Sequence, residues 1–214
     1  QPSGCPSTGN AMPTHRFPVA TFAILLAIAG MYWMAPDRTP LYFSAADIAR
    51  GEIWRLLTGH FAHADPEHLL WNGLGLAILG VLIERRSAVL LWIALGVGIV
   101  AVNILLLSPF SQLTYYCGLS GTLNSLLVVV LWLEWRASKS YWVAAIAFAC
   151  VLKVVVEITL ETSIVTNISW PPYAWSHAAG LLGGFLVMAF EANSTSERFT
   201  GGQDSYGSNS AHPE

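Results

Sequence analysis

Tyr116-Cys117-Gly118-Leu119-Ser120-Gly121-Thr122-Leu123-Asn124 opens an apolar run that continues through Leu133. Ser120 stands between two nearby glycines at the start of a membrane-length helix. A glycine has no side chain, so another backbone or a ligand can approach the chain closely there. A serine hydroxyl is a weak nucleophile that needs a neighbouring base. His177 is the one histidine in a later apolar run, so it is the candidate for that base.

The composition is typical of an integral membrane protein. Of the 214 residues, 54% are hydrophobic and only 11% are charged. A soluble domain has about 25% charged residues, so this chain has too few to cover a water-facing surface. The formal net charge of -3 excludes a basic surface for nucleic acid. The three cysteines, Cys5, Cys117 and Cys150, have no paired spacing and predict no disulfide framework.

The hydropathy pattern predicts an all-α integral membrane domain over residues 17–190, built as a bundle of six transmembrane helices. A helix needs about 20 apolar residues to cross the hydrocarbon. The expected spans are residues 17–34, 67–83, 88–107, 115–133, 141–160 and 173–190. Residues 1–16 are expected to be a disordered N-terminal segment, and residues 191–214 a flexible polar tail.

The distribution of positive charge predicts which way this bundle faces. With both termini in the cytoplasm, the inner segments carry more Lys and Arg than the outer ones, as the positive-inside rule requires. The inner set is Arg16, Arg85, Arg86, Arg136, Lys139 and Arg198, and the outer set is Arg38, Arg50 and Arg55. The second, fourth and sixth spans then begin at the outer side. They carry His68 with Asn72, Ser120, and His177, so these groups fall at one depth.

Ser120 and His177 are the candidate catalytic pair. A histidine inside a span usually faces the protein interior and is a candidate functional residue, although it can also be a satisfied core residue. At matching depth the two side chains suit a nucleophile and its general base. The fourth and sixth spans carry no Asp or Glu near that depth. The sequence therefore predicts a dyad without an acidic third member.

Glycines on the fourth and sixth spans predict close packing beside this pair. His177, Gly180 and Gly184 share one helical face, and the spacing from Gly180 to Gly184 lets two helices approach closely. Gly121, together with Gly118, leaves matching space beside the serine. Close packing of these faces would bring Ser120 to His177.

A second polar cluster opens the second span. Asp65 suits a helix N-cap and Pro66 the first helical turn. His68 and Asn72 are four residues apart and share a face. An asparagine amide suits an oxyanion hole, because it donates without a change of protonation. Hydrogen bonding between helices is the plainer interpretation of these two side chains.

Taken together, these motifs resemble the rhomboid family of intramembrane serine proteases. The matching pieces occur in family order over about residues 40–190: Trp54-Arg55, His63 with His68 and Asn72, Gly118-Leu119-Ser120-Gly121, and His177 followed by Gly180. The resemblance implies Ser120 as nucleophile and His177 as base. It implies oxyanion stabilisation by Asn72, His68 and the backbone N–H of Ser120. It also implies a loop over residues 36–66, partly in the outer leaflet, with Trp54 and Arg55 in structural roles. Neither a cofactor nor a metal is expected.

The run from Gly51 to His60 resembles the rhombosortase branch of that family. The branch implies a bacterial inner-membrane enzyme whose active site opens to the periplasm. It also implies single-span membrane substrates that end in Gly-Gly, an apolar helix and a basic tail. Ser176 departs from the family pattern, which usually has Ala before the histidine, and its hydroxyl could perturb the base.

Lys153 and Glu157 are four residues apart in the fifth span, and the sequence favours a structural ion pair that neutralises itself in the membrane.

Two other functions stay open. The side chains of His60, His63, Asp65, His68 and His177 could bind zinc in a membrane metallohydrolase, although the chain lacks a His-Glu-x-x-His run. A non-catalytic rhomboid-like protein that binds membrane proteins is the other alternative, although such relatives generally lack the serine or the histidine.

Overall fold

The computed structural model describes residues 17–160 and 173–200, with side chains described as far as residue 192. Within these residues the chain is helical and contains no strand, which confirms the predicted all-α class. The elements are α1 (Val19–Met34), η1 (Thr39–Leu41), α2 (Ala45–Ala49), α3 (Arg55–Phe61), α4 (Pro66–Glu84), α5 (Ala88–Leu107), α6 (Ser120–Ser138), α7 (Tyr141–Leu160) and α8 (Ala174–Thr200).

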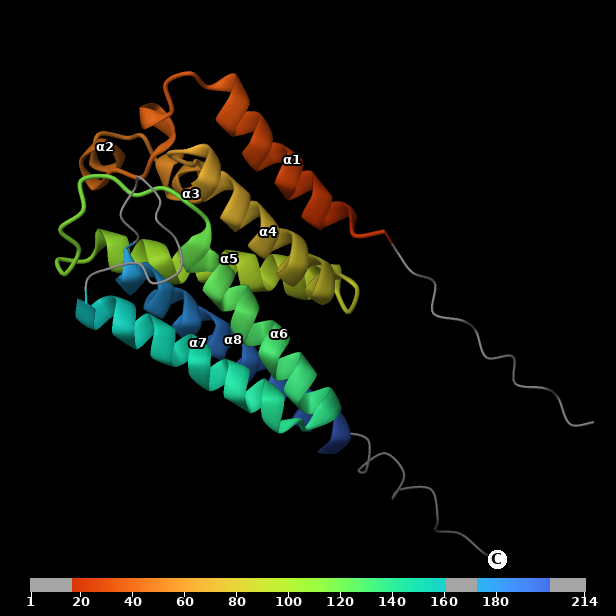
Figure 1. Ribbon diagram of the computed structural model, residues 1–214. Coiled ribbons are helices and arrows are strands. Elements are labelled where there is room, and N and C mark those ends of the chain that lie inside the picture. Colours follow the sequence, from red (N-terminus) through yellow and green to blue (C-terminus); the bar gives the residue numbers. More distant parts are fainter. Residues whose placement is uncertain (1–16, 161–172, 201–214) are drawn as a thin grey trace, which may run out of the picture.

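The long helices α1, α4, α5, α6, α7 and α8 lie where the sequence predicts the spans (Figure 1). Among the described residues, α4, α5 and α7 are long and apolar enough to cross a membrane, and α1 is a shorter apolar helix. α6 and α8 carry more polar residues. Three membrane-length helices support integration in a bilayer, and the count of six crossings stays a prediction.

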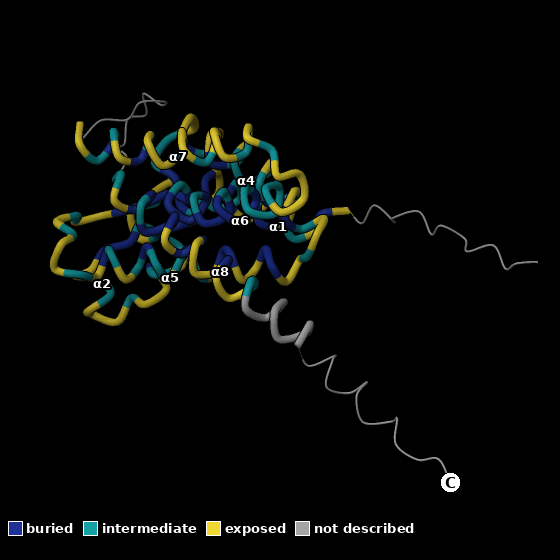
Figure 2. The backbone as a smooth tube through the Cα atoms, turned by 90° about the horizontal axis from the view of Figure 1, so that it is seen from below, coloured by how far each residue is buried: buried dark blue, intermediate teal, exposed yellow. Residues whose placement is uncertain are grey.

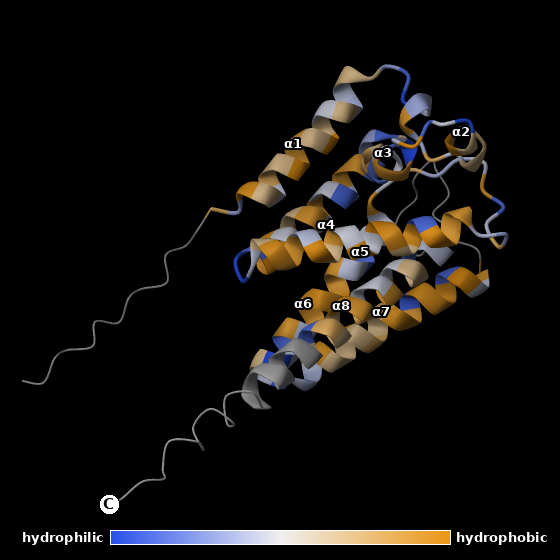
Figure 3. Cartoon of the chain, turned by 180° about the vertical axis from the view of Figure 1, so that it is seen from behind, coloured by the Kyte–Doolittle hydropathy of each residue, from blue (hydrophilic) through white to orange (hydrophobic). Residues whose placement is uncertain are grey.

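α6 is the central helix, in contact with α4, α5, α7 and α8. Its neighbours approach where small residues face it: a Cβ at Gly98 of α5 would lie 2.9 Å from Ser125, and one at Gly75 of α4 would lie 2.9 Å from Leu123. Figure 2 shows the buried residues concentrated along the middle of the bundle. The outward faces are apolar (Figure 3), with side chains such as Leu26 and Phe148 largely exposed. Such faces suit contact with lipid.

The short elements η1, α2 and α3 gather at one end of the bundle, beside the first turns of α4 and α6 (Figure 1). Arg55 connects them, and its side chain is 6% exposed. The Arg55 guanidinium donates to the carbonyl oxygens of Thr39 and Tyr42, both at 2.8 Å, and to Glu52. Trp54 is half exposed, and its indole N–H donates to Pro40 at 3.4 Å.

Two helix ends refine the sequence predictions. Asp65 caps α4 by accepting a hydrogen bond from the His68 backbone N–H at 2.7 Å, and Pro66 occupies the first turn, as predicted. α6 begins at Ser120, whereas the fourth span was expected to begin at residue 115, because Tyr116 pairs with Phe43 as an isolated bridge and Gly118 has a positive φ. α8 continues past residue 190 to Thr200.

Candidate active site

Ser120 and His177 meet at the end of the bundle covered by α2 and α3. The His177 Nε2 atom lies 3.1 Å from the Ser120 Oγ atom, within hydrogen-bond reach. His177 is 5% exposed, whereas Ser120 is partly exposed and stands at the first turn of α6. A hydroxyl that contacts an imidazole nitrogen in this way has the geometry of a nucleophile beside a general base.

Glu157 lies on the opposite side of the His177 ring, and this corrects two sequence predictions. The Glu157 Oε2 atom is 3.1 Å from His177 Nδ1, and Lys153 Nζ is 2.8 Å from the same carboxylate. The predicted dyad therefore has an acidic neighbour after all. The prediction failed because it considered only the two helices that carry Ser120 and His177. The Lys153–Glu157 pair exists, but it contacts the site instead of standing apart from it.

The position of Glu157 along α7 indicates that it lies at the depth of His177. The residue lies three positions before the end of α7 at Leu160, and His177 lies three positions after the start of α8 at Ala174. Consecutive antiparallel helices have their adjoining ends at similar depth, on the same side of the bundle. The sequence pattern was interpreted as placing Glu157 near mid-membrane, so its match in depth with His177 was not predicted.

The segment that leads into Ser120 is fixed on two sides. Tyr116 and Phe43 exchange backbone hydrogen bonds of 2.9 and 3.1 Å, and the Gly118 N–H donates to the Gly59 carbonyl at 2.9 Å. Gly118 has φ +111°, a conformation that side chains with a Cβ rarely adopt. These contacts hold the turn from which α6 begins and so set the position of the serine.

The polar cluster of α4 packs against this turn. A Cβ at Gly118 would clash with the His68 ring and would lie 3.4 Å from the Asn72 amide nitrogen. Both side chains are buried, and the Asn72 Nδ2, His68 Nδ1 and His63 Nε2 atoms have no hydrogen-bond partner among the described residues. Buried donors without partners are costly, so an oxygen atom placed beside Gly118 would satisfy the Asn72 amide. The predicted oxyanion residues thus lie beside the Ser120 turn.

The glycines predicted to allow close packing do bring α6 and α8 together. A Cβ at Gly180 would overlap the Gly121 carbonyl oxygen, and one at Gly184 would lie 2.6 Å from Val128 Cβ. A Cβ at Gly121 would lie 3.0 Å from both the Ser176 carbonyl oxygen and the Tyr116 hydroxyl. The backbones of the two helices are therefore in contact beside Ser120 and His177.

Ser176 does not perturb the histidine through its hydroxyl. The Ser176 Oγ atom donates to the Tyr173 carbonyl oxygen at 2.7 Å, within the first turn of its own helix. Its side chain is fully buried. The departure from the family pattern is accommodated by this local bond.

The histidines do not gather as zinc ligands. His60 contacts Asn103 at 3.3 Å and Thr122 at 3.4 Å, whereas His63 packs its ring against that of His68. Among the described residues, no three His, Cys, Asp or Glu side chains converge as metal ligands would. A hydrogen-bond network that was not predicted from the sequence joins α3, α5 and α6 through His60, Asn103 and Thr122. Thr122 is two residues from Ser120 along α6.

Comparison with known proteins gives a consistent result. A family model described as the Rhomboid domain matches residues 50–194. Rhomboid protease GluP of Bacillus subtilis (strain 168) is 30% identical over 145 residues, which cover 66% of this chain and 27% of GluP. Putative rhomboid protease YdcA of the same organism is 25% identical over 181 residues, covering 80% of this chain and 87% of YdcA. The chain thus spans about a quarter of the length of GluP and most of YdcA.

Proposed function

Because this chain belongs to the rhomboid family, we propose that it is an intramembrane serine endopeptidase with Ser120 as nucleophile and His177 as general base. The observation that carries the proposal is the 3.1 Å contact between Ser120 Oγ and His177 Nε2. The names of both relatives as proteases support it. The partial exposure of Ser120 supports access for a substrate.

The proposed reaction proceeds in two halves. Ser120 Oγ bonds to the carbonyl carbon of the scissile peptide while its proton passes to His177 Nε2, and the carbonyl oxygen becomes an oxyanion. The C–N bond then breaks, and the leaving amine takes the proton from His177. Water next attacks the acyl-enzyme, with His177 again accepting a proton, which releases the new carboxyl end and restores Ser120.

We assign oxyanion stabilisation to Asn72, His68 and the backbone N–H of Ser120. The unpartnered Asn72 amide beside Gly118 supports this role. Donors that are fixed before the reaction need no reorganisation when negative charge develops on the oxygen. The buried setting strengthens their effect by excluding water.

The proposed substrates are single-span membrane proteins, cut near the outer membrane boundary beside glycines. A helical substrate has its backbone groups bonded within the helix, so it must unwind locally before a carbonyl can reach Ser120. Each glycine weakens a helix by about 1 kcal/mol relative to alanine. The resemblance of residues 51–60 to the rhombosortase branch favours a Gly-Gly motif followed by an apolar helix and a basic tail. We also propose that the enzyme lies in the bacterial inner membrane, with its active site open to the periplasm.

The activity is tested by incubating the full chain in lipid vesicles with a single-span protein that ends in such a motif. We expect cleavage by the wild type and none by Ser120→Ala. Cleavage that survives Ser120→Ala and stops with a chelator would point instead to a metallohydrolase. Binding without any product, unchanged by Ser120→Ala, would point to a non-catalytic binding protein.

The substrate assignment needs a second comparison. Replacing the two glycines of the substrate by leucines should slow cleavage strongly, while the same change to leucine at two alanines deep in its apolar helix serves as a control for general changes. Equal cleavage of the leucine version would overturn the Gly-Gly assignment and leave the protease activity standing.

A further inference from the structure

We propose that Glu157 and Lys153 act as positioning residues that orient and charge-stabilise His177, so that the site works as a serine–histidine–glutamate triad with a lysine behind it. This inference rests on the proposed function. His177 Nδ1 lies 3.1 Å from Glu157 Oε2. Lys153 Nζ lies 2.8 Å from both carboxylate oxygens. Glu157 is 2% exposed, so its contacts within the protein replace those with water.

The carboxylate determines which ring nitrogen of His177 carries the proton. An ionised carboxylate only accepts hydrogen bonds, so its partner atom Nδ1 has to be the donor. The lone pair of Nε2 is then free to face the Ser120 hydroxyl, which is the tautomer that a general base needs. Without Glu157 the ring could adopt either tautomer.

Lys153 and Glu157 also balance charge in a medium that disfavours it. An isolated carboxylate inside a bilayer is costly, and an adjacent ammonium group offsets that cost. When His177 accepts the serine proton, it becomes a cation that faces an anion already in place. Among the residues that the structure describes, the other titratable group that interacts with this ring is His68 of α4, while α5 carries no titratable side chain. Glu157 is therefore the anion that the protonated ring faces.

The test measures the rate at which a fluorophosphonate labels Ser120 as a function of pH, using the full chain in detergent micelles. In this reaction the Oγ–P bond forms, the P–F bond breaks with loss of fluoride, and the serine proton passes to His177. The readout needs no knowledge of the natural substrate. Thermal unfolding of each variant identifies those that have lost their fold.

We expect Glu157→Gln to lower the labelling rate by about 10²-fold, less than the ~10⁴-fold loss when a Ser-His-Asp triad loses its carboxylate function. Its acidic limb should move to lower pH, because the protonated ring loses its anionic neighbour. Lys153→Met should move the acidic limb to higher pH, because the carboxylate then attracts the protonated ring without competition. Opposite shifts are not expected from two merely structural residues.

The matched control is Glu134→Gln, which makes the same chemical change in α6 at an exposed ion pair with Arg86. It should leave rate and pH profile unchanged. A folded Glu157→Gln variant with wild-type rate and profile would overturn the triad, while loss of labelling in Ser120→Ala and His177→Ala would keep the protease proposal. Labelling that persists in Ser120→Ala would instead overturn the protease proposal.

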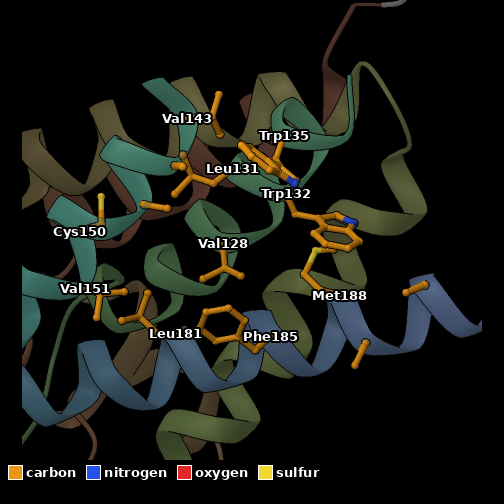
Figure 4. Close-up of a pocket in the computed structure, with 14 residues that line it drawn as sticks. Val128, Leu131, Trp132, Trp135, Val143, Cys150, Val151, Leu181, Phe185 and Met188 are labelled. Atoms are coloured by element: carbon orange, nitrogen blue, oxygen red, sulfur yellow. The ribbon is translucent and has the colours of Figure 1, made fainter. Parts of the chain in front are cut away.

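Between α6, α7 and α8 lies an apolar pocket of about 420 Å³ (Figure 4), within the ~300–1,000 Å³ typical of small-molecule sites. It exists because α7 faces its neighbours with small side chains here, notably Ala147 and Cys150. Phe185 and Met188 of α8 form the opposite wall.

We infer that this pocket binds the acyl chain of an anionic phospholipid. Trp132 and Trp135 line the pocket near the end of α6 (Figure 4). The Arg136 guanidinium lies over the Trp132 ring at 5.9 Å and the Lys139 ammonium lies over Trp135 at 5.6 Å. Both basic side chains are exposed. A basic pair at the mouth of an apolar cavity suits a lipid with a negatively charged headgroup.

Lipid binding is measured by native mass spectrometry of the full chain with phosphatidylglycerol or phosphatidylcholine. We expect retained phosphatidylglycerol, about tenfold less in Arg136→Gln/Lys139→Gln, and a similar loss in Ala147→Phe, which fills the pocket. The matched controls are Arg85→Gln/Arg86→Gln, a double change at the end of α4, and Ala149→Phe, an exposed position of α7. Neither control should lose lipid.

Cys150 provides a second measurement that needs no substitution. Phosphatidylglycerol should slow alkylation of Cys150 by N-ethylmaleimide in the wild type, while phosphatidylcholine should not. Equal binding of the two lipids would overturn headgroup selection. Full binding in the folded Ala147→Phe variant, or alkylation of Cys150 at an unchanged rate, would overturn the pocket as the site.

Discussion

Replacing Gly180 by alanine should separate Ser120 from His177 while leaving the bundle folded. An added Cβ would overlap the Gly121 carbonyl oxygen and lie 2.9 Å from its carbon, against 3.4 Å or more in ordinary contact. Both atoms are backbone, so no side chain can rotate away. The helices must therefore move apart by roughly 1 Å, a displacement that can cost about 10²-fold in rate when it misplaces catalytic groups.

The distance between Ser120 and His177 makes the site sensitive to this shift. It is 3.1 Å now, and a movement of that size takes the two atoms beyond hydrogen-bond reach. Overpacking of this kind costs about 1–3 kcal/mol of stability, so the variant should melt earlier but remain folded at 25 °C. We expect fluorophosphonate labelling of Ser120 to slow by about 10²-fold or more.

Gly96→Ala is the matched control, because a Cβ there meets nothing within 4 Å. It makes the same substitution on α5 and should label at the wild-type rate. If folded Gly180→Ala also labels at the wild-type rate, the close approach of α6 and α8 does not set the geometry of the site, and the packing argument fails.

Two further predictions concern the residues around the site. Asn72→Ala should lower kcat by roughly 10²–10³-fold with a smaller effect on KM, as for a single oxyanion donor; steady-state kinetics checks this, and full activity would assign Asn72 to packing. Burial lowers the pKa of His60 to about 4, and burial together with the neighbouring His68 lowers the pKa of His63 to about 3. Both rings are therefore neutral in the folded protein, and below about pH 6.5 they take up a proton when the protein unfolds. The protein is thus most stable above that pH and loses stability as the pH falls toward the folded-state pKa values. Each of the two histidines should lower the free energy of unfolding by about 2 kcal/mol between pH 7.5 and pH 5. The Tm should therefore be lower at pH 5 than at pH 7.5, and this difference should be smaller in His60→Gln. A Tm that does not change with pH would contradict the neutral state of these rings.

Local pattern predicted the helices well, because each long apolar run has only one way to satisfy its backbone in a membrane. The predicted ranges 88–107 and 141–160 coincide with α5 and α7. The start of the fourth span was placed too early, since Tyr116 and Cys117 are apolar but belong to an extended segment paired with Phe43. Hydropathy measures the preference of a side chain for an apolar setting, and a buried loop satisfies that preference as a helix does.

The candidate pair was also accessible from the sequence. Ser120 and His177 are polar groups in apolar runs, and alternation of span direction places them at one side of the bundle. The glycine spacing on α8 indicated which face would meet α6. Depth and helical face are both periodic properties of a chain, so they can be read without knowing which helices are neighbours.

The pattern of residues along the chain predicts the helices, a shared depth for Ser120 and His177, and the small residues that let their helices touch. The packing of the bundle brings Glu157 of α7, paired with Lys153, to His177, and it brings Gly118 against the Asn72 amide. These contacts were not predictable along the chain because the packing of the whole bundle sets the rotation of each helix about its axis. The same packing decides which helices are neighbours. Along one helix, a carboxylate four residues from a lysine is explained by that ion pair alone. The packing of α8 against α7 shows that Glu157 Oε2, which accepts from Lys153, also contacts His177.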